Sequence, residues 1–379
     1  MKDHSLEVHG CHTYDATGAI SPSICLSATF RHPRFGESTG YDYGRVANPT
    51  RESLEKTVAL LERGGRSWAL SSGMAAVQLV FSLLSAGDHV LMSEDLYGGT
   101  VRLAEEVFAG YGVTFEYVDV RDLALVGKRM RSETKLVFIE TPSNPMMQIA
   151  DIAALSALAH ENGALLAVDN TFLSPHFQKP LTLGADIVLH SGTKYLCGHN
   201  DVIAGFLVLK DATSAEAKRI ELLAKAAGPN LSALDSWLML RSIKTLGVRV
   251  ERQAENALAI ARWLGTLPEV TEVLYPGLAD HPGYALQQKQ ASGAGGMISF
   301  KVRSAEIAKA ALGRLHLIAF AESLGGVETL LTYPIAQTHA EMPAALLKRT
   351  GLDDKLLRLS VGIEDVEDLK ADLQQALQG

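Results

Sequence analysis

The chain has few cysteines and no excess of positive charge. Its three cysteines, at positions 11, 25 and 197 of 379, show no C-x-x-C pattern or paired spacing that would suggest a disulfide framework or a zinc site. The formal net charge is −8, and no segment gathers lysines and arginines. We therefore expect neither nucleic acid nor an anionic membrane as a partner, and the scattered thiols suit a reducing cytoplasm.

Signals for export and membrane insertion are also lacking. The first residues carry Asp3 and Glu7 where a secretory signal would need an apolar run. Residues 68–87 contain no charge over a length that could cross a bilayer, but serines and a glutamine interrupt them. A short strand, a turn and a buried helix explain this stretch better, so we expect a protein that is neither exported nor inserted in a membrane.

Three common catalytic motifs are absent. The sequence has no G-x-G-x-x-G, no G-x-x-x-x-G-K-[ST] and no H-E-x-x-H. It therefore shows no fingerprint of a Rossmann dinucleotide site, a P-loop or a zinc protease, and we expect no bound metal.

The order of apolar and helical segments predicts an α/β fold. Between residues 66 and 210, short apolar runs ended by polar or glycine turns alternate with helical periods, which is typical of a mainly parallel sheet. We expect helices over 74–84, 100–111 and 152–161, and a long helical stretch over 231–267 that leads to a smaller C-terminal α+β domain. The seven expected strands are 67–70, 89–93, 114–118, 136–140, 165–169, 187–191 and 205–209.

The first 50 residues differ from the rest. They are rich in glycine, proline, serine and threonine, with few periodic segments, and predict an extended arm that cannot bury itself. We expect this arm, residues 1–50, to lie on a neighbouring subunit. A sheet domain over 51–246 and a C-terminal domain over 247–379 complete the predicted organisation.

Lys194 follows an expected strand at the carboxyl edge of the sheet, where open α/β sheets place their ligands. A lysine amine forms a Schiff base only after it loses a proton, and desolvation or a nearby cation favours that loss. Ser191 and Thr193 could donate hydroxyl hydrogen bonds to a phosphate. Alone, this S-x-T-K pattern is a weak signal, because a solvated loop lysine is the commoner explanation.

An acid ends the apolar run LLAVDN at 165–170. A carboxylate at the end of a buried strand is costly unless it meets a cation or hydrogen-bond donors. The protonated ring nitrogen of pyridoxal phosphate (PLP) is such a cation, and Asp169 could keep it protonated. For this residue taken alone, an N-cap or a structural ion pair is the alternative.

Three further features complete a set. The turn in WALSSGMAA places free backbone N–H groups near Gly73 and Met74 at a helix start, which suits a phosphate, although a tight turn needs glycine for its geometry alone. Tyr97 could stack on a flat ring, or be a core tyrosine. Arg358 could grip a carboxylate, or be a surface charge on an edge strand. Together with Lys194 and Asp169, these features indicate PLP.

The motifs also resemble those of a known family. The chain is similar to the Cys/Met-metabolism group of PLP enzymes, the trans-sulfuration enzymes of the aspartate-aminotransferase-like fold (fold type I). This resemblance implies PLP as the cofactor, a PLP-binding domain over 51–246 and a homotetramer built from two dimers. It covers nearly the whole length, through YDYGRVANPTR (41–51), SSGMAA (71–76), EDLYGGT (94–100), ETPSNP (140–145), VDNTF (168–172), HSGTKYLCGHND (190–201), ESLGGVETL (322–330) and RLSVGIED (358–365).

The resemblance implies a role for each candidate site residue. Lys194 would hold PLP as a Schiff base, Asp169 would meet the ring nitrogen, and Tyr97 would stack on the ring and assist the leaving group. The other roles fall into four sets: Gly73, Met74, Ser191 and Thr193 bind the phosphate; Tyr43 and Arg45 reach the phosphate from a neighbouring subunit; Arg358, Ser323 and Asn144 surround the substrate carboxylate and cofactor; Glu328 and Asp42 attract a distal ammonium.

Within that family, the sequence looks most like bacterial cystathionine γ-synthases that use an acylated homoserine, in GESTGYDY (36–43), GGVETLLTYPIAQTH (325–339) and Asn200. Methionine γ-lyases usually carry cysteine at the position of Gly99. Gly192 and Cys197 replace a more usual alanine and glycine, but neither change removes a chemical group that the reaction needs.

The resemblance implies γ-replacement on an O-acyl-L-homoserine by cysteine or sulfide. Cleavage of cystathionine at the γ or β carbon is an open alternative, because synthases and lyases share nearly all these residues. A PLP-binding protein without turnover is a more remote one.

Overall fold

A large sheet forms the centre of the computed structural model, which describes residues 1–11 and 16–378. Its strand order is β1-β7-β6-β5-β4-β2-β3. Only β7 runs antiparallel to its neighbours, so the sheet is mainly parallel, as predicted. The strands are β1 (Arg66–Leu70), β2 (His89–Ser93), β3 (Thr114–Val118), β4 (Thr134–Glu140), β5 (Leu165–Asp169), β6 (Ile187–Ser191) and β7 (Gly205–Leu209).

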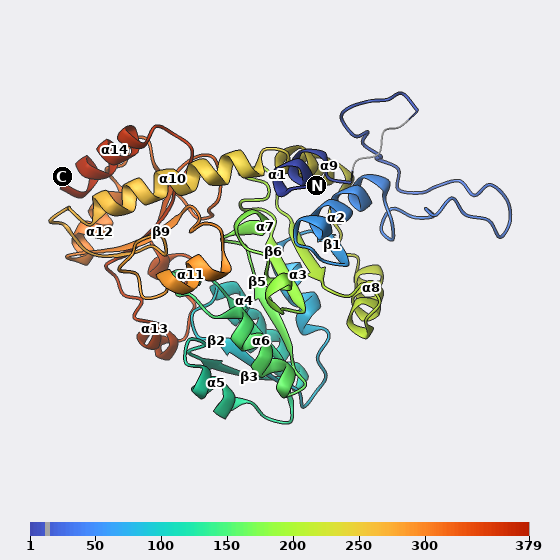
Figure 1. Ribbon diagram of the computed structural model, residues 1–379, viewed down its shortest axis with the longest axis horizontal. Coiled ribbons are helices and arrows are strands. Elements are labelled where there is room, and N and C mark those ends of the chain that lie inside the picture. Colours follow the sequence, from blue (N-terminus) through green and yellow to red (C-terminus); the bar gives the residue numbers. More distant parts are fainter. Residues whose placement is uncertain (12–15, 379) are drawn as a thin grey trace.

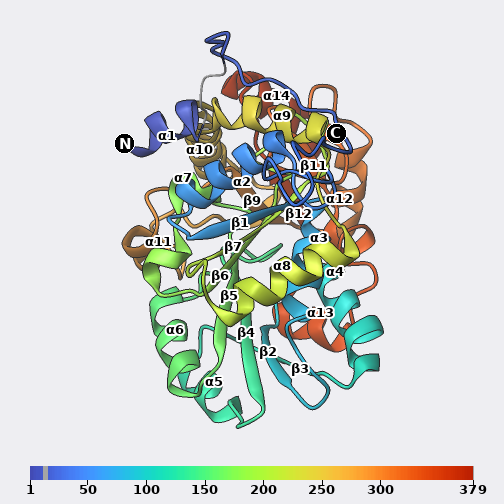
Figure 2. The same ribbon diagram turned by 90° about the vertical axis from the view of Figure 1, so that its right-hand side faces the viewer.

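Helices cover both faces of this sheet (Figures 1 and 2). Alternate residues of a strand point to opposite faces, so Phe206 of β7 joins the core under α2, α6 and α9, whereas Leu207 joins the core under α3 and α8. Both faces are therefore apolar, as in doubly covered parallel sheets. The helices are α2 (Pro49–Leu61), α3 (Gly73–Phe81), α4 (Gly98–Arg102), α5 (Leu123–Arg129), α6 (Ile152–Glu161), α7 (Ser174–Phe177), α8 (Ala215–Ala227) and α9 (Ala233–Ile243).

A second, smaller sheet has the order β10-β11-β12-β9-β8. The helix α10 (Leu246–Leu264) joins the two parts, because its Val250 packs in a core of the large sheet and its Ile260 in the core of the small one (Figure 1). The remaining elements are β8 (Val270–Leu274), α11 (Tyr284–Gln290), β9 (Met297–Val302), α12 (Ala305–Leu312), β10 (Ala319–Phe320), β11 (Leu330–Thr332), α13 (Ala344–Thr350), β12 (Leu356–Ser360) and α14 (Val366–Gln378).

The N-terminal segment is not extended throughout, which corrects the arm predicted from sequence. Its start forms the helix α1 (Asp3–His9), which buries Leu6 and Glu7. Seven residues are too few for a helical period to show in the sequence, so tertiary packing explains this helix better than its propensity. Part of the described chain after it projects from the body (Figure 1), but Trp237 Nε1 donates to Pro22 O and Cys25 N donates to Thr50 Oγ1. The segment ends at Asn48, which caps α2 by accepting from the backbone of Thr50 and Arg51.

Predicted and observed elements differ mainly at their ends. β1 begins at Arg66 and β4 at Thr134, each slightly earlier than expected, and α3 ends at Phe81 rather than at 84. The helix expected over 100–111 begins at Gly98 and continues as π and 3-10 turns to residue 111. The uncharged stretch 68–87 contains the end of β1 and all of α3, and no helix among the described residues combines the length and apolar character needed to span a bilayer.

Candidate active site

A cavity of about 290 Å³ opens at the carboxyl edge of the large sheet. Three neighbouring strands end there, at Glu140, Asp169 and Ser191, and the small-sheet part contributes β12 and the loop before β11. Most candidate residues thus come together although they are far apart in sequence. Those that line the cavity are Gly73, Met74, Tyr97, Asn144, Asp169, Ser191, Thr193, Lys194, Ser323 and Arg358.

Lys194 reaches across the cavity to the loop of the second part. Its Nζ donates to Ser323 Oγ over 2.7 Å. Ser323 has φ +86°, a left-handed conformation that is uncommon outside glycine and is typical of functional sites. Burial, together with the positive charge of Arg358, lowers the pKa of Lys194 from 10.5 to about 8, and Glu322 opposes this shift. A substantial fraction of the amine is therefore neutral near physiological pH.

Two acids lie side by side at the sheet edge, because Glu140 and Asp169 are register partners on β4 and β5. Burial raises the pKa of both, and the nearby charge of Asp169 raises that of Glu140 further, well above its usual range. The rise in pKa is opposed at Asp169 by Thr171, whose N and Oγ1 donate to Oδ1 over 3.0 and 2.5 Å.

Sequence reasoning missed Glu140, although a signal was present. It ends the apolar run 136–140 just as Asp169 ends the run 165–169, and the same argument about a strand-terminal acid applies to both. In the structure, Glu140 Oε2 accepts from the backbone N of Tyr97 over 3.0 Å and so fixes the start of α4.

The start of α3 forms a tight backbone cradle. Ser72 caps the helix by accepting from Ala75 N over 3.1 Å. A Cβ on Gly73 would lie 2.9 Å from Ser191 Cβ, and a Cβ on Gly205 would lie 1.9 Å from Ser72 O, so neither position accepts a side chain. Gly73 and Met74, which begin the first helical turn, line the cavity beside Ser191, an arrangement that suits a phosphate.

Thr193 is the fourth residue predicted to bind the phosphate, and its hydroxyl is already hydrogen bonded within the chain. Its Oγ1 donates to Ala204 O over 3.2 Å and accepts from Ala204 N over 3.0 Å. This pair of bonds ties the loop that carries Lys194 to the start of β7.

Arg358 is buried in the cavity wall, not placed on a surface edge strand. Its Nη1 donates to Asn144 Oδ1 over 2.7 Å, and its Nη2 contacts Ser323 O and Thr332 Oγ1 at 3.2 and 3.3 Å. Its buried Nε has no hydrogen-bond partner among the described residues. Burial lowers the pKa of Arg358 to about 10, so the side chain stays charged at neutral pH, and a substrate carboxylate is a suitable counterion.

The ring of Tyr97 is placed by the glycine that follows it two residues later. A Cβ on Gly99 would lie 2.5 Å from Tyr97 Cε1 and 3.2 Å from Met74 Sδ. A larger residue at position 99 would therefore push the Tyr97 ring away from its present place in the cavity.

Four candidate residues do not line the cavity of their own chain. Tyr43 is about half exposed on the projecting arm, where the guanidinium of Arg45 lies 5.7 Å from its ring. Asp42 Oδ1 accepts from Ser38 Oγ over 2.6 Å. Glu328 Oε2 instead accepts from Asn200 Nδ2 over 2.7 Å.

The cavity fits PLP on features of this structure. No described group donates to Oδ2 of Asp169, which leaves that oxygen for a cationic ring nitrogen. The α3 cradle and Ser191 would hold the phosphate, and Lys194, with its lowered pKa, would bind the aldehyde. Tyr97 would lie against the ring.

Comparison with known proteins agrees with this geometry. The family model for "Cys/Met metabolism PLP-dependent enzyme" matches residues 4–378. Three proteins of Bacillus subtilis (strain 168) are each 46% identical to the chain: a cystathionine γ-lyase (100% of both chains), a cystathionine β-lyase (96% of this chain, 93% of the other) and a cystathionine γ-synthase/O-acetylhomoserine (thiol)-lyase (96% and 92%).

A solved structure extends the likeness to three dimensions. The cystathionine γ-lyase of Lactobacillus plantarum, complexed with L-serine, superimposes with a TM-score of 0.96 at 42% identity over 100% of this chain and 99% of that one. The chain belongs to the Cys/Met-metabolism family of PLP-dependent enzymes of sulfur amino-acid metabolism, and PLP is its cofactor.

Proposed function

We propose that the enzyme is of the cystathionine γ-synthase type and replaces the γ-substituent of an O-acyl-L-homoserine with the sulfur of L-cysteine or sulfide. The observation that carries the substrate class is the position of Ser323 between two cations: its Oγ accepts from Lys194 and its backbone O accepts from Arg358. A carboxylate bound at Arg358 would bring its α-amino group close to Lys194. The site therefore suits an α-amino acid.

The proposed chemistry divides among four side chains. PLP, when bound, withdraws electrons from the substrate carbon next to the amino group. Arg358 holds the α-carboxylate, and Asp169 supplies the negative charge that keeps the ring nitrogen protonated. The neutral amine of Lys194 takes the proton from Cα. Tyr97 assists departure of the γ-substituent as an acid or base.

Two observations support γ-replacement. Glycine at position 99 leaves room for the Tyr97 ring, because a Cβ at that position would collide with the ring. Methionine γ-lyases usually carry cysteine at this position. The segments 36–43 and 325–339 resemble synthases that use acylated homoserine, and one B. subtilis relative is named as such an enzyme. Cystathionine cleavage is the second candidate, because the γ-lyase relative is equally similar over the full length of both chains.

A comparison of rates tests this ranking. PLP-loaded enzyme is incubated with O-acetyl-L-homoserine plus L-cysteine, and separately with cystathionine alone, and the products are measured by chromatography. We expect synthesis of cystathionine to exceed its breakdown, because γ-replacement is the proposed reaction. Faster breakdown would assign the enzyme to the lyases, and keto-acid analysis would then distinguish γ- from β-cleavage.

The lowered pKa of Lys194 predicts how the apoenzyme takes up PLP. Only the neutral amine attacks an aldehyde, so the rate of covalent uptake should rise with pH through about 8 and then level off. An unperturbed lysine, with a pKa of 10.5, should keep gaining rate well beyond that point. The absorbance change on mixing with PLP gives the rate of uptake as a function of pH, for the apoenzyme and for N-acetyl-lysine methyl ester as the unperturbed amine. Identical pH profiles for the two would contradict the lowered pKa of Lys194.

We further propose that the arm serves another subunit in a homotetramer. Neither Tyr43 nor Arg45 lines the cavity of its own chain: Tyr43 is about half exposed, and the exposed Arg45 donates from Nη1 to Lys225 O at the end of α8. An enzyme lacking residues 1–47 should lose its oligomeric state in gel filtration. An unchanged elution volume would contradict this arrangement.

A further inference from the structure

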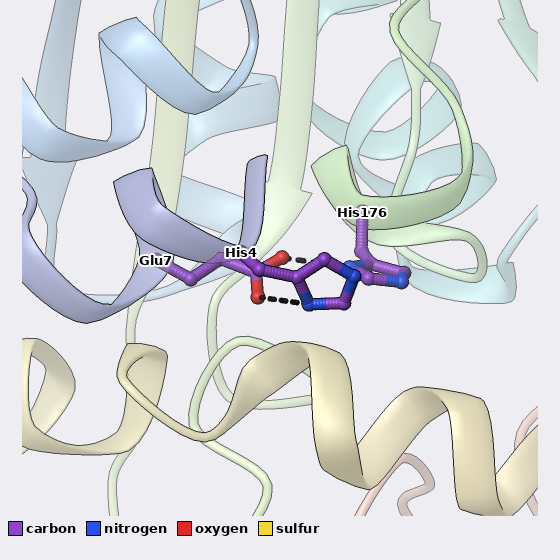
Figure 3. A group of neighbouring side chains, drawn as sticks. All are labelled: His4, Glu7 and His176. Carbon is purple, nitrogen blue, oxygen red and sulfur yellow. Dashed lines mark hydrogen bonds and ion pairs between the residues drawn. The ribbon is translucent and has the colours of Figure 1, made fainter. Parts of the chain in front are cut away.

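We propose a transition-metal site, suited to Zn²⁺, where the N-terminal helix α1 meets the body of the protein. Two histidines and two glutamates from three helices converge there: His4 and Glu7 of α1, His176 of α7 and Glu251 of α10. This cluster lies outside the cavity that contains Lys194. Figure 3 shows the Glu7 carboxylate directed toward both imidazole rings.

Glu7 occupies the inner side of the cluster. Its side chain is only 3% exposed, its Oε1 lies 2.7 Å from His176 Nδ1 and its Oε2 accepts from Gly247 N over 3.1 Å. His4 Nδ1 lies 3.9 Å from the same Oε2. A carboxylate bonded to one ring nitrogen fixes the tautomer and orientation of the imidazole, so that Nε2 of His176 is left with its lone pair free to bind a metal.

Glu251 occupies the outer side. Its Oε1 lies 3.4 Å from His176 Nε2 and 3.5 Å from His4 Nε2, both longer than an ordinary hydrogen bond. Ligand bonds of about 2.0 to 2.2 Å to a tetrahedral Zn²⁺ put neighbouring ligand atoms roughly 3.3 Å apart. These two separations are close to that edge length, and His4, Glu7 and His176 each place one possible ligand atom within 4.8 Å of the others.

The donor chemistry selects the class of metal. Two imidazole nitrogens and a carboxylate oxygen suit Zn²⁺ and its neighbours among the divalent transition metals, whereas Ca²⁺ and Mg²⁺ prefer oxygen donors alone. The carboxylates of Glu7 and Glu251 balance the charge of a dication. His4 is 64% exposed, so it can turn to complete the site and the metal can enter from solvent.

A metal here would fasten α1 to the body. His4 comes from the N-terminal segment, while His176 and Glu251 come from α7 and α10, whose positions the large core already fixes. Binding would therefore stabilise the docked position of α1 and, through it, the base of the arm.

Equilibrium dialysis with Zn²⁺ tests the site in the full-length, PLP-loaded enzyme prepared without an affinity tag. We expect one Zn²⁺ per chain at this site. The variant His4→Ala should weaken its binding by more than tenfold, and Glu7→Gln by about 10- to 100-fold, the usual effect of losing an outer partner of a ligand. Zn²⁺ should raise the Tm of the wild type and leave that of His4→Ala unchanged.

His9→Ala is the matched control, because His9 is exposed on the same short helix and belongs to no part of the cluster. It should bind Zn²⁺ as tightly as the wild type. Less than half an equivalent in the wild type, or equal affinities for wild type and His4→Ala, would overturn the proposal. Equal weakening by His4→Ala and His9→Ala would also overturn it, because the metal would then bind to α1 nonspecifically.

Discussion

Replacing Lys194 with alanine should lower kcat by about 10⁴-fold or more, because in the proposed mechanism this side chain provides both the covalent attachment of PLP and the base for the Cα proton. The fold should survive the change, since the side chain contributes a single hydrogen bond, to Ser323. Turnover of O-acetyl-L-homoserine with cysteine measures the effect, and circular dichroism measures the fold.

Lys210→Ala is a suitable control, because Lys210 is an exposed lysine that follows β7, away from the cavity. This variant should keep wild-type turnover. Borohydride reduction of PLP-supplied protein should label the peptide that contains Lys194 in the wild type and in Lys210→Ala, and no peptide in Lys194→Ala. A label on another lysine of the wild type would refute the assignment.

Replacing Arg358 with lysine should lower kcat/KM by roughly 10²- to 10³-fold. A guanidinium can hold a carboxylate through two charge-assisted hydrogen bonds, each contributing about 1.5 to 3 kcal/mol, and an ammonium keeps the charge but not that geometry. Because the carboxylate is bound before and during the reaction, much of the loss should appear as a higher KM. Steady-state kinetics with varied O-acetyl-L-homoserine gives both constants.

Arg249→Lys separates this role from the general cost of changing a buried arginine. Arg249 is also buried, and its Nη atoms donate to Tyr195 O and Ser242 O over 2.9 and 3.1 Å, but it does not line the cavity. This variant should lose stability and keep the wild-type KM. Similar KM values for Arg358→Lys and Arg249→Lys would show that Arg358 has a structural role instead.

Local patterns predicted the fold and the centre of the site. The ends of apolar runs located Asp169 and the strand before Lys194, because parallel strands bring their carboxyl ends to one edge of the sheet. The same rule places Glu140, at the end of the run 136–140, on this edge as well, although it was not among the predicted site residues. The resemblance to a known family added Ser323 and Asn144, which the fold then placed beside Arg358.

Other features depend on contacts that no local pattern encodes. The helix α1 forms against α2 and α10, and its seven residues show too little periodicity to be predicted. The cluster of His4, Glu7, His176 and Glu251 joins positions far apart in the chain, which only the folded structure brings together. The contribution of Asp169 to the raised pKa of Glu140 likewise depends on the register of two neighbouring strands.

The crowding at Gly73 and Gly205 has a practical consequence for protein engineering. Both positions lack room for even a methyl group, so mutant libraries that vary them would consist mainly of misfolded or cofactor-free proteins. Thr100, Ile203 and Thr338 also line the cavity but lie outside this crowded turn. Libraries directed at new thiol or leaving-group preferences should therefore diversify these three positions and keep both glycines constant.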